Sequence, residues 1–107
     1  MNSSNQPLVS IVVPTRNSAE TLPLCLASIR RQTYRNIEVI VVDSYSTDNT
    51  VEIAKRFGAK VIQVAGERAR AKNVGLRLAK GKYVLFIDSD MVLTPRVVEK
   101  CIQVRAN

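Results

Sequence analysis

Short apolar runs alternate along this chain with segments whose apolar residues recur at helical spacing. The runs are rich in β-branched residues and contain few polar positions, which is typical of strands that are buried on both faces of a sheet. Four strands are expected, at residues 8–13, 37–42, 60–64 and 83–87. Four amphipathic helices follow them. The first is expected to begin near Thr21 and the third at Glu67, whereas the second is expected to have its N-cap at Ser46 or Thr47 and the fourth its N-cap at Thr94, followed by Pro95 as the first helical residue.

The expected helices each carry an apolar stripe, and some carry recognisable end signals. Their inward-facing residues are Leu22, Cys25, Leu26 and Ile29 in the first helix, Val51, Ala54 and Phe57 in the second, Ala71, Val74, Gly75 and Leu78 in the third, and Val98, Cys101 and Ile102 in the fourth. Asn17, with Glu20 three residues later, resembles a capping box. Gly58 is expected to end the second helix.

The alternation of strands and helices predicts an α/β fold in which helices cover both faces of a mostly parallel sheet. Right-handed crossover connections then favour the strand order 3-2-1-4, in a Rossmann-like three-layer αβα arrangement. Ligands of such sheets bind beyond the carboxyl ends of the strands, where the chain reverses direction between strands one and four. Residues 8–107 are expected to form this single domain, and residues 1–7 a flexible tail.

The composition is that of an ordinary globular domain, and it excludes several classes of site. Among the 107 residues, 46% are hydrophobic, 23% are charged and none is histidine. Histidine-based catalytic triads and most zinc sites are thereby excluded. Cys25 and Cys101 both lie at apolar helical positions, so two buried, reduced thiols are expected rather than a disulfide or a metal site.

The formal net charge of +7 favours an anionic partner. Aromatic residues make up only 5% of the chain and do not alternate with basic residues, which argues against a stacking platform for single-stranded nucleic acid. No nucleic-acid partner is therefore expected. The apolar run at residues 8–13 is too short for a signal peptide or a membrane span, which predicts a cytoplasmic protein.

Polar residues cluster where three of the expected strands end. They are Pro14, Thr15, Arg16 and Asn17 after strand one, Asp43, Ser44, Tyr45 and Ser46 after strand two, and Asp88, Ser89 and Asp90 after strand four. Because the three strands are neighbours in the expected order, their carboxyl ends should bring these side chains to one crevice. This crevice is the candidate site.

Asp88 and Asp90 are the most informative pair, because two carboxylates follow abruptly after an apolar strand. Two close carboxylates repel each other unless a cation lies between them. Mg²⁺ and Mn²⁺ bind few protein carboxylates and complete their coordination with water and substrate phosphate. A turn with an Asx-type cap is the simpler explanation of such a triplet. The facing Asp43 favours the metal-site interpretation.

The chain contains neither a P-loop nor a dinucleotide-binding glycine motif. A metal ion is then the expected means of neutralising a phosphate-bearing ligand. A basic run at residues 68–82 could contribute to this. Within it, Arg68 is expected nearest to the strand ends, because it lies at the start of the third helix.

Two long stretches of the chain carry a family resemblance. They read VSIVVPTRNSAETLPLCLASIRRQTYRNIEVIVVDSYSTDNTVEIAKRFGAKVI and ERARAKNVGLRLAKGKYVLFIDSD. Together they resemble the N-terminal half of family 2 glycosyltransferases, which have the GT-A fold and include dolichyl-phosphate sugar transferases and many polysaccharide synthases. The resemblance extends from residue 8 to about residue 105. It implies a partial GT-A fold and a nucleoside diphosphate sugar as donor, together with Mg²⁺ or Mn²⁺.

The resemblance also implies a role for the residues of the candidate site. Those that would bind the nucleotide sugar are Pro14, Thr15, Arg16, Asp43, Arg68, Asp88 and Ser89, and those that would hold the metal are Asp88 and Asp90. Two positions depart from the usual pattern. Ser44 stands where the family often has a second acid that can contact the base, which leaves the base open. Lys72 stands before Asn73 where the family often has arginine.

The family's catalytic base and most of its acceptor contacts come from the second half of the domain, which this sequence does not contain. We therefore expect a fragment that transfers no sugar by itself and forms a homodimer through its unpaired fourth strand or last helix. The acceptor stays open among polyprenyl phosphate, lipid and polysaccharide, and a full-length enzyme could lie at the inner membrane surface. The alternative function is a non-catalytic nucleotide-binding or self-associating module. A phospho-acceptor receiver domain is disfavoured because no fifth strand is visible.

Overall fold

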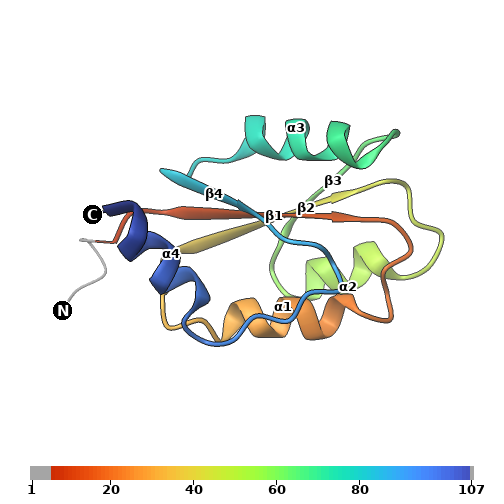
Figure 1. The fold of residues 1–107 in the computed structure, drawn as a ribbon. Coiled ribbons are helices and arrows are strands. Elements are labelled where there is room, and N and C mark those ends of the chain that lie inside the picture. Colours follow the sequence, from red (N-terminus) through yellow and green to blue (C-terminus); the bar gives the residue numbers. More distant parts are fainter. Residues whose placement is uncertain (1–5, 107) are drawn as a thin grey trace.

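The chain folds into a four-stranded parallel sheet between two layers of helices (Figure 1). The computed structural model describes residues 6–106. Its elements are β1 (Val9–Thr15), α1 (Leu22–Arg30), β2 (Ile37–Asp43), α2 (Thr50–Arg56), β3 (Lys60–Gln63), α3 (Arg68–Leu78), β4 (Tyr83–Phe86) and α4 (Val97–Ala106). The strand order β3-β2-β1-β4 confirms the predicted order 3-2-1-4 and the predicted three-layer αβα fold.

The tail expected at residues 1–7 is described only in part. Residues 1–5 lie outside the described residues. The main-chain oxygens of Gln6 and Pro7 accept hydrogen bonds from the side chains of Asn36 and Tyr34, so these two residues are held against the domain.

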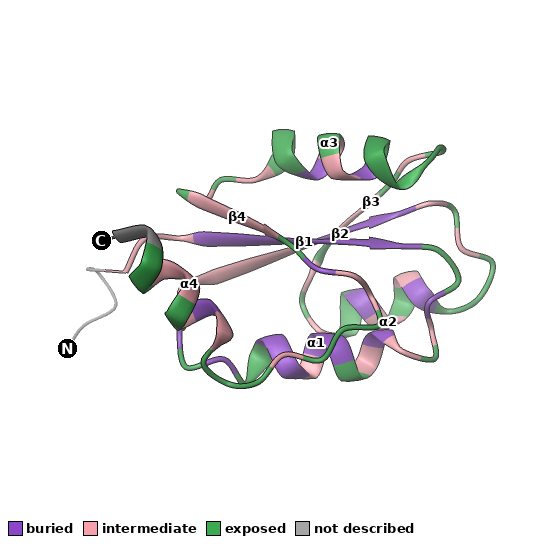
Figure 2. Cartoon of the chain, viewed as in Figure 1, coloured by how far each residue is buried: buried purple, intermediate pink, exposed green. Residues whose placement is uncertain are grey.

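Side chains that alternate along the central strands fill two separate cores. On one face of the sheet, Val9, Ile11 and Val13 of β1 pack with buried residues of α1, α2 and α4. On the other face, Val12 of β1 packs with residues of β2 and with Ala71 of α3. Figure 2 shows that burial is deepest along β1 and the carboxyl half of β2. Both faces of these strands are covered, which explains why their apolar runs are almost continuous.

Helix α3 approaches β1 very closely at Gly75. A Cβ atom at this position would lie 2.4 Å from Cγ1 of Val12, so only glycine permits this packing. Gly75 and Ala71 are buried as predicted. Leu78, predicted to face inward with them, is instead 43% exposed. It is the last residue of α3, and the following Ala79 packs against the core in its place.

Helix α2 begins later than the sequence pattern predicted. The cap expected at Ser46 or Thr47 is wrong, because α2 begins at Thr50 and the Ser46 hydroxyl is hydrogen-bonded to Asp43. The carboxylate of Asp48 instead accepts hydrogen bonds from the amide and the hydroxyl of Thr50. The predicted end of the helix is confirmed, since Gly58 follows it in the left-handed region with a φ of +80°.

Helix α4 also begins later, at Val97 instead of Pro95, so the N-cap predicted at Thr94 is wrong. The main-chain oxygens of Thr94 and Pro95 accept hydrogen bonds from residues just beyond the end of α1, which hold this segment outside the helix. Val98 is fully buried as predicted, whereas Cys101 is only half-buried. Both cysteines are free thiols, and Cys25 is buried.

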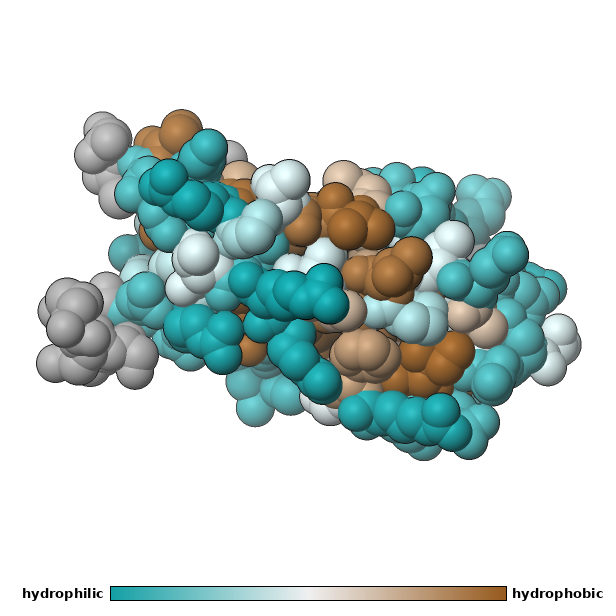
Figure 3. Space-filling model, turned by 90° about the horizontal axis from the view of Figure 1, so that it is seen from below, coloured by the Kyte–Doolittle hydropathy of each residue, from teal (hydrophilic) through white to brown (hydrophobic). Residues whose placement is uncertain are grey.

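Seen from the side of α1 and α2, the surface is mostly hydrophilic, with separate apolar patches (Figure 3). Exposed large apolar side chains of the chain include Leu24 and Val92, which are 65% and 62% exposed. Isolated residues of this kind are ordinary on soluble domains. None of the helices in residues 6–106 is both long enough and apolar enough to cross a membrane.

Glu38 on β2 ties the sheet to the connection between α3 and β4. Its carboxylate accepts hydrogen bonds from the Ser10 hydroxyl, from the Lys80 amide at 2.7 Å and from Lys60 Nζ at 2.9 Å. Burial alone would raise the pKa of Glu38. The hydrogen bonds and the charge of Lys60 outweigh burial and lower the pKa from 4.5 to about 2.

Glu38→Gln is expected to remove a part of the stability that depends on pH. Because folding lowers the pKa of Glu38, its stabilisation is complete above the unfolded value of 4.5 and is lost as the pH falls towards 2. The wild type should exceed the variant in free energy of unfolding by about 2–3 kcal/mol near pH 6.5 and by less near pH 3. Urea denaturation at the two pH values checks this. Glu52→Gln, at a side chain that is 62% exposed, is the matched control. An equal deficit at both pH values would contradict the assignment.

Candidate functional site

A small open pocket of about 240 Å³ lies at the carboxyl ends of the strands. Its lining residues are Pro14, Thr15, Arg16 and Ser18 from the end of β1, Ser44 after β2, Gly66, Glu67, Arg68 and Ala71 around the start of α3, and Ser89 after β4. The structure therefore brings together five of the predicted residues from three distant segments. This follows from the position of β1 between β2 and β4.

Asp43, another predicted site residue, is fully buried at the end of β2, beside Thr15 of β1. Its Oδ1 accepts hydrogen bonds from the hydroxyls of Thr15, at 2.7 Å, and Ser46. Its Oδ2 accepts from the Ser46 amide at 2.8 Å and from the side-chain amide of Gln63 at 3.1 Å. Sequence reasoning did not find Gln63, because it lies on β3, 20 residues away.

The environment of Asp43 keeps its carboxylate charged. Burial alone would raise the pKa of Asp43, but the hydrogen bonds from Ser46, Thr15 and Gln63 lower it below its ordinary value. In this arrangement the carboxylate orients the two strand ends, and it could accept a hydrogen bond from a nucleoside only by releasing one of these partners. The direct contact with a base therefore stays a prediction.

Asn17 joins the loops after β1 and β2, a role that the sequence pattern did not indicate. Its side-chain oxygen accepts a hydrogen bond from the main-chain amide of Thr47 at 2.7 Å, and its main-chain amide donates to Ser46 Oγ at 2.7 Å. The predicted capping box of Asn17 and Glu20 is wrong, because Thr21 precedes α1 and no side chain caps the helix. The available signal was asparagine itself, which tolerates the positive φ of 49° found here.

Asp88, Ser89 and Asp90 form a turn that begins two residues after the end of β4, and we call it the acidic turn. The Met91 amide donates to the main-chain oxygen of Asp88 at 3.0 Å, and the Ser89 hydroxyl lies 3.1 Å from that of Ser18. Main-chain atoms close this turn, so a turn at this position is compatible with a ligand-binding role for the carboxylates of Asp88 and Asp90.

Arg68 at the start of α3 reaches the acidic turn. Its Nη1 lies 3.1 Å from Asp88 Oδ1, and the two side chains are 59% and 44% exposed. An ion pair this open to water stabilises the fold by less than about 1 kcal/mol. Both partners can therefore exchange this contact for a charged ligand at little cost.

The donor atoms of the acidic turn fit a hard divalent cation. The side chains of Asp88 and Asp90 are both accessible to solvent. Among residues 6–106, no group of three or more His, Cys, Asp and Glu side chains gathers in one place. An ion would take two carboxylates here and draw its other ligands from water or phosphate, as Mg²⁺ and Mn²⁺ do. Burial and the negative charge of Asp90 raise the pKa of the nearby Cys25 thiol to about 11, so this thiol is protonated at neutral pH.

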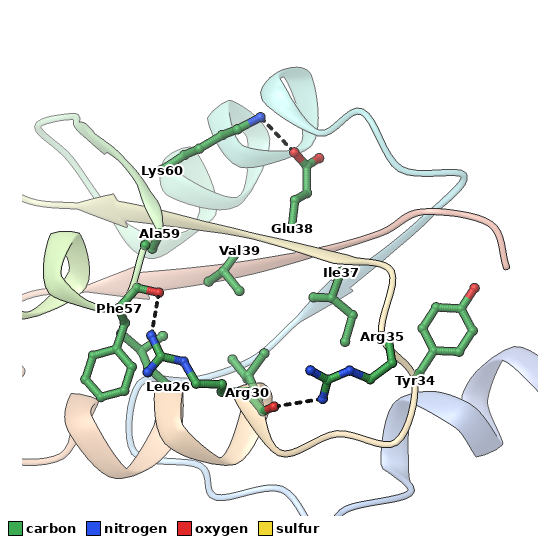
Figure 4. A pocket seen from close by; sticks show the side chains of 12 residues that line it. Leu26, Arg30, Tyr34, Arg35, Ile37, Glu38, Val39, Phe57, Ala59 and Lys60 are labelled. Atoms are coloured by element: carbon green, nitrogen blue, oxygen red, sulfur yellow. Dashed lines mark hydrogen bonds and ion pairs between the residues drawn. The ribbon is translucent and has the colours of Figure 1, made fainter. Parts of the chain in front are cut away.

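A larger pocket, of about 380 Å³, lies at the opposite, amino-terminal end of β2 and β3 (Figure 4). Its two arginines donate hydrogen bonds to main-chain oxygens at the ends of helices. Arg30 donates to the main-chain oxygen of Phe57 at 3.2 Å and covers its ring, and Arg35 donates to the main-chain oxygen of Arg30 at 3.3 Å. Helix ends leave such carbonyls without intrahelical partners. The guanidinium groups thus stabilise α1 and α2, and no predicted site residue lines this pocket.

Known proteins resemble this chain in both sequence and structure. The family profile described as Glycosyl transferase family 2 matches residues 10–104. Glycosyltransferase GlyG of Streptococcus pneumoniae serotype 4 is 40% identical over 103 residues, which cover 90% of this chain and 34% of GlyG.

Two solved structures show the same fold. S. aureus TarS 1-349 in complex with UDP-GlcNAc superposes with a TM-score of 0.82 at 31% identity, over 90% of this chain and 30% of that TarS 1-349 chain. Mannosyltransferase PcManGT from Pyrobaculum calidifontis, in complex with GDP-Man and Mn²⁺, gives a TM-score of 0.72 at 32% identity, over 85% of this chain and 30% of PcManGT.

The chain spans about a third of the length of GlyG. The family profile, by contrast, covers nearly all of the chain, and the sheet with its 3-2-1-4 order matches those of GT-A glycosyltransferases. With its fold and its strand-end residues, the chain belongs to glycosyl transferase family 2.

Proposed function

We propose that this chain is the donor-binding half of a metal-dependent glycosyltransferase. The ion pair between Arg68 and Asp88 carries the proposal, because it joins the basic start of α3 to the acidic turn at the carboxyl ends of the sheet. A site with both signs of charge suits a diphosphate that is bridged by a divalent cation. TarS has been crystallised with UDP-GlcNAc, and PcManGT with GDP-Man and Mn²⁺, which are ligands of this class.

Each predicted residue has a place in this proposal. Asp88 and Asp90 would hold Mg²⁺ or Mn²⁺, which stabilises the negative charge of a diphosphate leaving group. Arg68 supplies a second positive charge at the same edge of the sheet. The nucleoside would lie along Pro14, Thr15 and Arg16, which line the pocket, with Asp43 orienting Thr15 and with Ser89 and Asp88 near the ribose.

The acceptor side of the reaction would come from residues outside these 107. Relatives such as GlyG are about three times as long as the part that this chain matches. We propose that the base that deprotonates the acceptor lies in that additional part, and that the acceptor is a polyprenyl phosphate, a lipid or a polysaccharide. The 107-residue chain by itself should then bind donor without transferring sugar. Turnover by the short chain, assayed beside a longer form of the protein, would show that the base is misplaced.

Calorimetry with UDP and with GDP, each in the presence and absence of Mn²⁺, tests the donor proposal. Mn²⁺ alone should bind weakly, and it should strengthen the binding of at least one of the two nucleotides, because the phosphates supply the ligands that the protein lacks. Chelation of the metal should reverse the gain. Affinities that do not depend on Mn²⁺ would contradict the metal-bridged site.

The isolated chain is also proposed to self-associate through β4. In residues 6–106, β4 pairs only with β1 and lies at the edge of the sheet. Between β4 and α4 runs a groove of about 730 Å³, whose apolar residues include Leu85 and Val104, the latter 76% exposed. A second copy of the chain would bury this edge.

Sedimentation velocity at low micromolar concentration should show a dimer, and Val104→Lys should return it to a monomer. Leu24→Lys alters another exposed apolar residue, on α1, and serves as the matched control. A monomeric wild type would remove this proposal.

A further inference from the structure

The connection between β4 and α4 carries the acidic turn and is attached to α1 along its length. Residues 87–96 contain no helix or strand. Figure 1 shows this connection running beside α1 before it enters α4. At its start, the Ile87 amide donates to the main-chain oxygen of Val12 in β1 at 3.0 Å. After the acidic turn, the connection is hydrogen-bonded to Ser28 of α1 and to Gln32 and Thr33, which lie just beyond the end of α1.

Gln32 makes the most complete of these attachments. It follows α1 and is only 1% exposed. Its side-chain Nε2 donates to the main-chain oxygen of Thr94 at 2.7 Å and to that of Ser28 at 3.2 Å. Its Oε1 accepts a hydrogen bond from the Val98 amide at 3.0 Å. Val98 is the second residue of α4, where an amide has no partner within its own helix. A single buried side chain therefore fixes the end of the connection and caps the next helix.

Ser28 and Thr33 extend the same attachment in both directions. The Ser28 hydroxyl accepts a hydrogen bond from the Leu93 amide at 3.0 Å while donating to the main-chain oxygen of Cys25. The Thr33 amide donates to the main-chain oxygen of Pro95 at 2.8 Å. The Leu93 amide is the first of these hydrogen-bonded groups along the chain, and only Met91 and Val92 separate it from the acidic turn.

We infer that Gln32 is a positioning residue for the acidic turn, a conclusion that rests on the proposed donor site at Asp88 and Asp90. A buried amide side chain costs free energy unless all its groups are paired, and an apolar side chain would fill the same space without that cost. The amide instead provides hydrogen bonds of defined direction. It pairs one carbonyl of the connection and one N–H of α4 at defined places, which limits the positions that the turn can take.

Gln32→Met keeps the length of the side chain and removes both kinds of hydrogen bond. In this variant, the NMR order parameters of the Ser89, Asp90 and Met91 amides should fall from the rigid range to below about 0.6. The gain in UDP affinity that Mn²⁺ gives the wild type should shrink by about fivefold to tenfold.

Ile29→Ala is the matched control, because Ile29 is buried in α1 but packs on the sheet side and makes none of these hydrogen bonds. It should lower the melting temperature without changing the order parameters of the acidic turn. Unchanged order parameters in folded Gln32→Met would overturn the inference, as would an equal loss in Ile29→Ala. A wild type whose UDP affinity is independent of Mn²⁺ would remove the donor proposal, whereas a mobile turn in Gln32→Met would still establish the positioning role.

Discussion

Asp43→Ala should lower the free energy of unfolding by about 3 kcal/mol, because it removes the acceptor of four hydrogen bonds at a fully buried position. The Ser46 amide and the Thr15 hydroxyl would lose a charged partner. Asp43→Asn should cost about 1–2 kcal/mol, since its oxygen can still accept from Ser46 and Gln63 while its amino group donates to the two hydroxyls, which can reorient. Urea denaturation of both variants measures the difference.

Thr15→Val is the matched control for Asp43, because it removes a single one of these hydrogen bonds and preserves the shape of the side chain. An Asp43→Ala protein as stable as the wild type would contradict the structural role. Nucleotide affinity of folded Asp43→Asn separates this role from a direct contact. A direct hydrogen bond to the base would make the variant bind more weakly by about 1–3 kcal/mol, whereas orientation of Thr15 alone predicts a smaller change.

Asp90→Ala should weaken Mn²⁺-dependent binding of a nucleoside diphosphate by tenfold or more, about 1.4 kcal/mol at least. The variant removes one of the two carboxylates proposed to hold the metal. The water molecule that would take its place is neutral, so the negative charge of the carboxylate is not replaced. Binding measured with a chelator should be unchanged. Stability should change little, because Asp90 is exposed. Calorimetry of the wild type and the variant, with and without Mn²⁺, gives both comparisons.

Glu52→Ala is the matched control for Asp90. It removes one carboxylate that is 62% exposed and pairs with Arg56 on α2, so the net charge of the protein changes by the same amount. If Glu52→Ala weakened binding as much as Asp90→Ala, the effect would be one of overall charge. If neither variant changed the dependence on Mn²⁺, the acidic turn would be a structural turn without a metal.

The sequence by itself determined the fold class, the strand order and the position of the candidate site. Continuous apolar strands can be stable only when helices cover both faces of the sheet, and right-handed connections then leave few possible orders. In a parallel sheet all strand ends of one kind meet at one edge. The residues after β1 and β4 were therefore predicted to meet, and Arg68 and Ser89 line the same pocket.

Only the tertiary structure decided which groups the polar side chains bind. Asn17, Ser46 and Thr94 each stand where a helix could begin, yet each has a partner outside a helix. The main-chain amide of Asn17 donates to Ser46 Oγ, 29 residues away, and the main-chain oxygen of Thr94 accepts a hydrogen bond from Gln32, 62 residues away. The Ser46 hydroxyl donates to the buried carboxylate of Asp43. Local sequence patterns indicate only which hydrogen bonds a side chain can make within one turn of its own helix. Packing brings in hydrogen-bond partners from distant segments, and these partners are already desolvated and correctly placed. The same reason hides Gln32 from the sequence, because the carbonyl and the amide that it pairs exist at that place only after α1 and the β4–α4 connection have packed together.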